Sequence, residues 1–222
     1  MLILDSSGIF RAESFSRIPG LIHGFGTRLS QLWPGARATA VVRQAHSADV
    51  VVVDAPGEYG QADALVTSQS GFVVAIRTAD CVPALIVDPQ THTVAAVHAG
   101  WRGMAAEILP TTLDKMSRHF GTRAADVLVA IGPAIGQCCF EVGPEVAAQF
   151  RRWFPERDDL SQKTNIDLRE TALRQLAGAG VSQESITAVE DQCTRCNPDR
   201  FHSWRRDGQQ SGRMVSAIGW ED

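Results

Sequence analysis

The stretch TVAAVHAGWRG, residues 93–103, runs through small and β-branched residues and then changes abruptly into a glycine-rich turn. Its first half is apolar at successive positions, which is typical of a strand in a sheet covered on both faces. Its second half places His98, Trp101 and Arg102 in a turn where two glycines let the backbone come close to a ligand. The stretch therefore predicts a buried strand that presents chemistry-bearing side chains at its end.

Similar runs rich in Val, Ile and Ala recur along the chain and predict further strands. We predict strands over residues 38–45, 50–54, 72–78, 84–88, 93–99, 127–132, 186–191 and 213–220, and helices over 105–120, 144–154 and 167–179. Pro110 must lie in the first turn of its helix or kink it. The strands cluster between residues 38 and 99, so the pattern is no regular βαβ alternation. We predict an α/β fold in which residues 1–222 form a single layered domain, a mixed β-sheet with helices packed on its faces.

The composition narrows the classes of function. The formal net charge is −4 and the basic residues are scattered, which argues against a nucleic-acid partner. Asp5 interrupts the apolar N-terminus, and no apolar run approaches the roughly 18 residues that a membrane span requires. We therefore predict a cytoplasmic protein with no membrane partner, while the sequence indicates no oligomeric state.

Three side chains that can bind a metal stand where apolar runs break: His46, Cys81 and His98. If these positions lie at one sheet edge, two imidazoles and a thiolate form a three-ligand set suited to Zn²⁺ with one position open for catalysis. The same residues also fit two other hypotheses: isolated, hydrogen-bonded residues at strand ends, or a Cys81 nucleophile with a histidine base. Asp80 would either orient an imidazole or remain a solvated turn residue.

The turn after His98 has a second possible use. A helix beginning near Met104 would point free N–H groups at whatever lies beside His98, which favours an anion. Arg102 could add a guanidinium group or lie on the surface, and Trp101 could stack on a flat ring or pack in the core.

Five cysteines are an odd number in a chain large enough to fold without disulfides, so reduced thiols are expected. Cys193 and Cys196 form one CxxC pair. Because no second CxxC accompanies it, a zinc ribbon is not predicted, and the pair is interpreted as packed or incidental thiols. The adjacent Cys138 and Cys139 are expected only to pack.

Seven motifs, in this order, resemble the family of YfiH-like, multicopper polyphenol oxidase-like or laccase-domain proteins. They are HGFGTR (23–28), RQAHSADV (43–50), ADALVTSQSG (62–71), TADCVPALIVDP (78–89), AAVHAGWRG (95–103), IGPAIGQCCFEVGPEV (131–146) and FHSWRRDGQQSGRM (201–214). The resemblance implies an α/β domain with mixed sheets and a zinc site on His46, Cys81 and His98. It implies phosphorolysis of adenosine, inosine, guanosine and 5′-methylthioadenosine, with phosphate as co-substrate, and deamination of adenosine. Arg28 is then the candidate to bind phosphate or ribose.

The chain departs from the family pattern after Arg28. The segment LSQLWPGARAT, residues 29–39, leads almost directly to the QAH motif, so part of the usual pocket wall is missing or rebuilt. Three alternatives remain open beside the purine reaction. They are polyphenol oxidation with copper in the His–Cys–His site, hydrolytic editing of a peptidoglycan precursor through Cys81, and a non-enzymatic metal-binding or redox-responsive role. Six histidines without a His-x-His pair do not fit a conventional multicopper oxidase.

Overall fold

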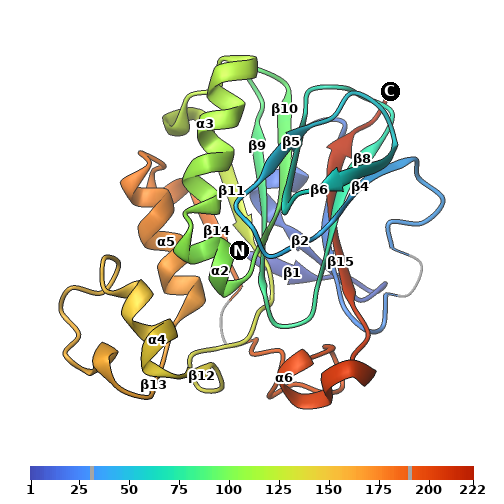
Figure 1. Cartoon of the computed structure of the whole chain (residues 1–222). Helices are drawn as coiled ribbons and strands as arrows, with labels where there is room; N and C mark the ends of the chain where they lie inside the picture. Colours follow the sequence, from blue (N-terminus) through green and yellow to red (C-terminus); the bar gives the residue numbers. More distant parts are fainter. Residues whose placement is uncertain (31–32, 190–191) are drawn as a thin grey trace.

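Two β-sheets lie face to face, and helices cover the outer face of one of them (Figure 1). The computed structural model describes residues 1–30, 33–189 and 192–222. We call the sheet that the helices cover the inner sheet. It has six strands, in the order β14 (Ile186–Ala188), β11 (Leu128–Ile131), β9 (Val82–Asp88), β10 (Thr93–Ala99), β7 (Ala64–Thr67) and β5 (Val50–Val52). Its pairs are both parallel and antiparallel. The prediction of an α/β fold with a mixed sheet and packed helices is therefore confirmed for the described residues.

The strands β9 and β10 are buried along their whole length, which confirms the buried strand predicted from residues 93–103 for β10. They pair antiparallel from Thr93 opposite Asp88 to Ala99 opposite Val82. Alternate side chains, such as Val97, pack against the helices, while their neighbours, such as Ala96, pack against the second sheet. Because both faces of these strands are covered, their sequences are continuous apolar runs.

The second sheet has seven strands and closes the other side of the core. Its order is β1 (Leu2–Leu4), β2 (Ile9–Ala12), β3 (Leu21–Gly26), β15 (Met214–Trp220), β8 (Val73–Thr78), β4 (Thr39–Arg43) and β6 (Gly57–Gln61). A separate two-stranded sheet joins β12 (Glu141–Val142) to β13 (Thr164–Asn165). The sequence analysis did not predict strands β1, β2, β3, β6, β7, β12 and β13. The predicted strand over 186–191 is shorter, ends at Ala188, and has its last residues outside the described part of the chain.

Two longer helices, α3 (Ile108–Phe120) and α5 (Leu168–Gly178), cover the inner sheet on the left of Figure 1. Pro110 lies in the first turn of α3, and the side chain of Asp167 accepts a hydrogen bond from the Glu170 N–H at 2.9 Å, which caps α5. The shorter helices are α1 (Glu13–Ser16), α2 (Trp101–Ala105), α4 (Pro144–Ala147) and α6 (Trp204–Asp207). Short 3₁₀ turns span Ala124–Asp126, Ala148–Phe150, Asp159–Ser161, Gln183–Ser185 and Gly208–Gln210.

Two predicted helix boundaries are wrong. The helix expected over 144–154 is a single α-turn, Pro144–Ala147, followed by a 3₁₀ turn, Ala148–Phe150. Pro155 disfavours helical geometry at Phe154, the last residue of the predicted helix. The helix expected to begin near Met104 begins at Trp101 instead, and Glu107, with φ 62°, separates it from α3. Within the described residues, no helix has both the length and the apolar character needed to cross a bilayer.

Candidate metal centre

The side chains of His46, Cys81 and His98 meet at one edge of the inner sheet. One donor atom from each lies within 4.8 Å of those of the other two, and we call this group the His–Cys–His triad. Cys81 directly precedes β9, and His98 lies on β10 opposite Pro83, so the antiparallel register brings the two together. His46 lies in the loop after β4, with its ring edge-on to His98 and the ring centroids 4.9 Å apart.

A buried carboxylate, Asp63, organises this group from behind. It accepts hydrogen bonds from the backbone N–H groups of Ala45 at 3.1 Å, His46 at 3.0 Å and Ser47 at 2.6 Å. It also accepts from the Ser47 hydroxyl at 2.9 Å and from Nδ1 of His98 at 2.7 Å. Because Nδ1 of His98 donates to Asp63, Nε2 of that ring is left as the nitrogen available to a metal. The sequence analysis did not identify Asp63. The one sequence feature that points to it is its position directly before the buried strand β7.

The triad favours a thiolate at Cys81. Burial alone would raise the pKa of the Cys81 thiol, but hydrogen bonds with His46 and His98 outweigh it and lower the pKa to about 7. Burial would likewise lower the pKa of His98, but hydrogen bonds with Asp63 and Cys81 raise that pKa to about 9. The thiolate is the form that binds metals and the form that attacks electrophiles, so this balance suits both hypotheses for Cys81.

The backbone of Gly100 closes one side of the triad. A Cβ atom added at this position would lie 3.0 Å from Cδ2 of His46 and 3.1 Å from Sγ of Cys81. Both distances are shorter than ordinary van der Waals contact, so only glycine leaves the three donors their present spacing.

Neither role considered for Asp80 is found. Its buried carboxylate accepts hydrogen bonds from the Thr194 hydroxyl at 2.5 Å, the Ser203 hydroxyl at 3.1 Å and the Arg205 N–H at 2.6 Å. Asp80 is therefore buried, and its hydrogen-bond donors in the described structure are two hydroxyls and a backbone N–H rather than an imidazole. It binds the C-terminal segment directly beside Cys81, because its acceptor oxygens are buried and need partners.

The three residues proposed to bind substrate have different surroundings. Trp101 is partly buried against the helix-side core, and the guanidinium carbon of Arg102 lies 4.2 Å from the centroid of its ring. Arg28 is exposed; its guanidinium donates to the Pro198 carbonyl at 2.5 Å and its N–H to the Arg200 carbonyl at 2.9 Å. Arg28 is thus held against the C-terminal segment.

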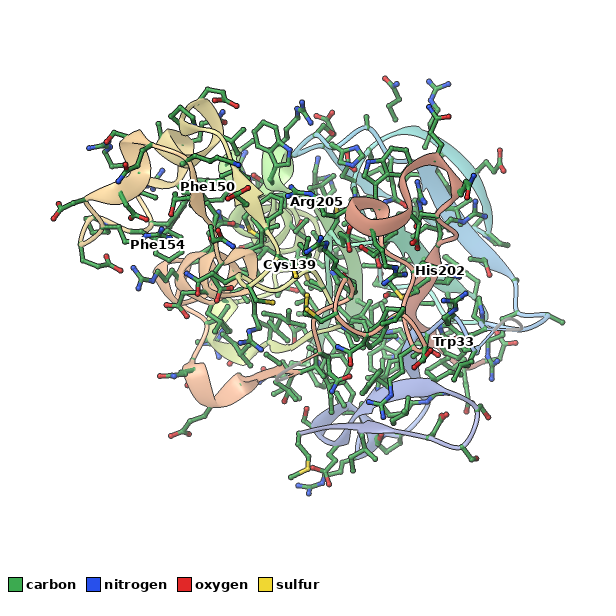
Figure 2. The ribbon with its side chains drawn as sticks, turned by 90° about the horizontal axis from the view of Figure 1, so that it is seen from below. Trp33, Cys139, Phe150, Phe154, His202 and Arg205 are labelled. Atoms are coloured by element: carbon green, nitrogen blue, oxygen red, sulfur yellow. The ribbon has the colours of Figure 1, made fainter. Side chains whose placement is uncertain are left out.

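The segment that follows Arg28 lines a hollow of about 530 Å³ on the second sheet. Within it, Trp33, labelled in Figure 2, lies under two guanidinium groups, with Arg11 at 4.6 Å and Arg37 at 5.9 Å from its ring. No member of the His–Cys–His triad lines this hollow. The part of the chain that departs from the family pattern therefore forms a basic, aromatic hollow of its own.

The comparison with known families decides the relationship. The family model described as "Multi-copper polyphenol oxidoreductase laccase" matches residues 27–221. The chain belongs to this laccase-like family. A purine nucleoside phosphorylase of Deinococcus radiodurans is 39% identical over 186 residues, covering 81% of this chain and 69% of the relative. An adenosine deaminase from an unknown prokaryotic organism is 38% identical over 193 residues, covering 79% and 72%.

The crystal structure of YlmD from Geobacillus stearothermophilus has a TM-score of 0.89 and 28% identity, covering 100% of this chain and 99% of that chain. The predictions of family membership, of fold class and of an enzyme are therefore confirmed. The laccase-like family's name refers to several copper ions, and its copper chemistry would need more histidine ligands. The other four histidines of this chain join no group of metal-competent side chains in the described residues.

Proposed function

We propose that this chain is a zinc-dependent purine nucleoside phosphorylase that also deaminates adenosine. The observation that carries the proposal is the His–Cys–His triad with Asp63 behind His98, at a hydrogen-bond distance of 2.7 Å. A carboxylate that orients a histidine in this way is typical of zinc centres, because it fixes the tautomer and direction of the ring. The names of the two relatives support the choice of reactions.

The donor set fits zinc. Two imidazole nitrogens and one thiolate sulfur supply three soft to borderline ligands, and the fourth tetrahedral position is left for water or substrate. The lowered pKa of Cys81, about 7, favours the charged ligand near neutral pH. A zinc ion bound there would supply a Lewis acid that acidifies water or polarises the purine.

The two reactions make different demands on the protein. In deamination, a water oxygen bonds to C6 of adenosine and ammonia leaves, which gives inosine. In phosphorolysis, a phosphate oxygen bonds to C1′ of the ribose while the bond to N9 breaks, and the purine leaves with a proton. The second reaction needs cationic groups that hold phosphate beside C1′, and guanidinium groups do this through charge-assisted hydrogen bonds.

In this proposal Arg28 and Arg102 bind phosphate or ribose, and Trp101 stacks on the purine. Trp101 and Arg102 begin helix α2, directly after the strand that carries His98, and already lie against one another, which supports a shared role. Adenosine, inosine, guanosine and 5′-methylthioadenosine are the proposed nucleosides. All four share the bond between N9 of a purine and C1′ of a ribosyl group, and they differ in the purine substituents or at the ribose 5′ position.

The test incubates zinc-loaded protein with adenosine, with and without phosphate, and separates the products by chromatography. We expect adenine and ribose 1-phosphate only when phosphate is present, and inosine in both cases. Cys81→Ala should abolish all three products. Arg28→Ala should raise the KM for phosphate, whereas Arg118→Ala, an exposed arginine paired with Asp114 on α3, should not.

The absence of all three products above the Cys81→Ala background would overturn the proposal. Copper can occupy the same donor set. Oxidation of a phenol by copper-loaded protein, with no turnover of nucleosides by the zinc form, would instead support the polyphenol oxidase alternative.

A further inference from the structure

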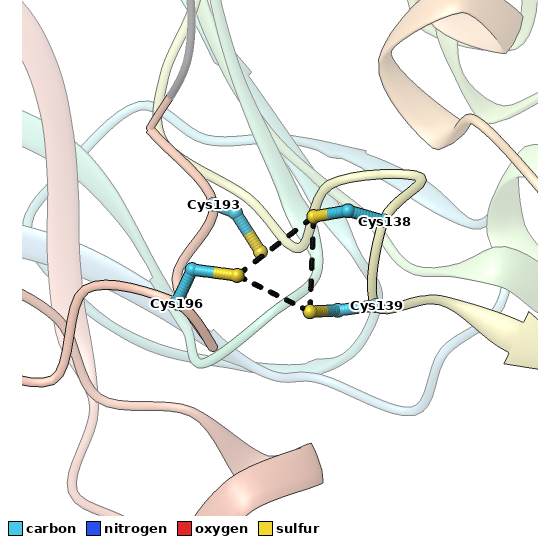
Figure 3. Close-up of side chains that lie close together, drawn as sticks. All are labelled: Cys138, Cys139, Cys193 and Cys196. Carbon is cyan, nitrogen blue, oxygen red and sulfur yellow. Dashed lines mark hydrogen bonds between the residues drawn. The ribbon is translucent and has the colours of Figure 1, made fainter.

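Four of the five cysteines meet at a second place in the fold (Figure 3). Cys138 and Cys139 lie in the loop between β11 and β12, and Cys193 and Cys196 in the segment between β14 and α6. Their sulfur atoms all lie within 4.8 Å of one another, and Figure 3 shows them pointing toward a common centre. The two cysteine pairs, which the sequence analysis considered separately, therefore pack against one another. We call this group the tetracysteine cluster.

The spacing of the sulfur atoms suits a shared metal ion. Sγ of Cys138 lies 3.7 Å from Sγ of Cys139 and 3.8 Å from Sγ of Cys196. Sγ of Cys139 lies 3.3 Å from Sγ of Cys196. Four thiolates at about 2.3 Å from a tetrahedral zinc ion lie about 3.8 Å from one another. A disulfide would need about 2.05 Å. The three sulfur–sulfur distances among Cys138, Cys139 and Cys196 are thus close to the edges of a zinc–sulfur tetrahedron, and Sγ of Cys193 lies within 4.8 Å of all three.

The two segments that carry the cysteines are held in place by their own backbone. The Thr194 N–H donates to the Ala134 carbonyl at 3.0 Å, which joins one segment to the other. On the second segment, the N–H and side-chain amide of Asn197 donate to the Cys193 carbonyl at 3.2 Å and 2.8 Å. The cluster therefore does not depend on flexible side chains alone.

Hydrogen-bond donors around the sulfur atoms suit thiolates. The Gly136 N–H donates to Sγ of Cys193 at 3.2 Å, and the Arg195 guanidinium donates to Sγ of Cys139 at 3.5 Å. Gly136 also leaves necessary space, because a Cβ atom there would lie 3.2 Å from Sγ of Cys138. Four thiolates around Zn²⁺ carry two excess negative charges, and a neighbouring guanidinium offsets part of them.

We propose that the tetracysteine cluster is a structural zinc site that fastens the segment of Cys193 and Cys196 to the loop of Cys138 and Cys139. Four protein ligands close the coordination shell, which is the mark of a structural rather than a catalytic site. Cys139 and Cys193 are buried, whereas Cys138 and Cys196 are exposed, so the ion can enter from solvent.

Both segments of the tetracysteine cluster form hydrogen bonds to Asp80, the residue directly before Cys81 of the His–Cys–His triad. Thr194, between the two cysteines of its segment, donates to the Asp80 carboxylate at 2.5 Å. From the other segment, the Ile135 N–H donates to the Asp80 carbonyl at 2.9 Å. Both segments thus contact the residue that directly precedes Cys81. A zinc ion that joins the segments would fix the turn that positions Cys81.

Arg205 makes a second connection between the cluster and Asp80. Its N–H donates to the Asp80 carboxylate, and its guanidinium donates to the Glu141 carbonyl at 2.9 Å, just beyond the cysteine loop. Figure 2 labels Arg205 and Cys139 close together near the centre of the lower face. Helix α6 is therefore tied to the same corner of the molecule.

The test uses the full chain with Cys81→Ser, which removes the thiolate of the triad and leaves the four clustered thiols. Purified with zinc and dialysed, this variant should retain about one zinc ion per chain. Exchanged with Co²⁺, it should show the charge-transfer and d–d absorption of a tetrahedral cobalt–thiolate site. Adding Cys138→Ser and Cys196→Ser should abolish both the retained zinc and the cobalt bands. Neither readout depends on nucleoside turnover.

A Cys81→Ser protein that retains no zinc, or that retains it equally after the two further substitutions, would overturn the proposal. If the triple variant does not fold, a thiol reagent titrated into the Cys81→Ser protein gives the same decision. Zinc should be released in step with modification of the thiols. Four freely reactive thiols with no zinc released, or a disulfide in the protein mass, would contradict the site.

Discussion

Replacing Asp63 by asparagine tests how the His–Cys–His triad is built. If the new amide nitrogen takes the place of Oδ2, it faces the N–H groups of Ala45 and Ser47, which lose their acceptor. If it takes the place of Oδ1, it faces the N–H of His46 and Nδ1 of His98. In that case His98 must give up its hydrogen bond or change tautomer. Either orientation sets donor against donor in a buried place.

The expected effects can be estimated from the hydrogen bonds. A bond to a charged acceptor contributes about 1.5–3 kcal/mol, so losing two should lower the free energy of unfolding by about 3–6 kcal/mol. Loss of the group that orients a ligating histidine typically lowers metal affinity by about 10–100-fold. Urea unfolding measures the first effect, and competition with a chromophoric zinc chelator measures the second. Cys138→Ser and Cys196→Ser should be present throughout, so that only the triad is titrated.

Asp88→Asn is the matched control. Asp88 is also buried, and its carboxylate accepts hydrogen bonds from the Gln90 N–H at 2.9 Å and the Thr91 hydroxyl at 2.7 Å, in the turn between β9 and β10. This substitution should lower stability without changing zinc affinity. Equal zinc affinities for Asp63→Asn and Asp88→Asn would refute the argument that Asp63 positions His98 for a metal.

Two further predictions concern packing and pH. Gly100→Ala should lower zinc affinity at the triad by about tenfold or more, because the new methyl group crowds two of the donors. Gly178→Ala is the control: nothing lies within 4 Å of its added Cβ, so it should leave the zinc affinity measured by chelator competition unchanged. Burial and the Arg11 guanidinium lower the pKa of His23 from 6.5 to about 4, so the unfolded chain binds the proton more tightly than the folded one. Stability from this group is complete above pH 6.5 and falls by about 3 kcal/mol as the pH drops to 4. In unfolding experiments across this range, His23→Gln should show a smaller loss than the wild type, and equal losses would contradict the assignment.

The sequence predicts the parts of the fold whose periodicity is set by burial on both faces. The strands β9 and β10 read as unbroken apolar runs because helices cover one face and the second sheet the other. Strand β3 (Leu21–Gly26) was missed because it contains a histidine and two glycines, which weaken a strand pattern. Gly24 is explained only by tertiary packing, since an added Cβ would lie 2.6 Å from Ile9. Non-local contacts of this kind leave no local pattern.

For the two candidate sites, too, the sequence reveals residues that stand out in a local pattern and misses those that only the fold brings together. The donors His46, Cys81 and His98 could be selected because each interrupts an apolar run. Asp63 could not, because its partners lie in the loop of His46 and on β10, and only the sheet register brings them together. The tetracysteine cluster escaped for a similar reason: an adjacent Cys–Cys pair has no recognised ligand spacing, and its partners lie more than fifty residues away.

Asp63 and Asp80 are two buried carboxylates that stabilise neighbouring loops around the His–Cys–His triad. Asp63 binds the loop of His46, and Asp80 binds the C-terminal segment beside Cys81. Each gathers N–H and O–H donors from distant segments, because a buried carboxylate without partners is costly. In both places a non-glycine residue takes a left-handed conformation, with φ 59° at His46 and φ 89° at Asp80. Such backbone geometry costs about 1–3 kcal/mol and persists only where other contacts enforce it. The charge-assisted hydrogen bonds to the two carboxylates offset that cost, so removing either carboxylate should release its loop as well as weaken the metal centre.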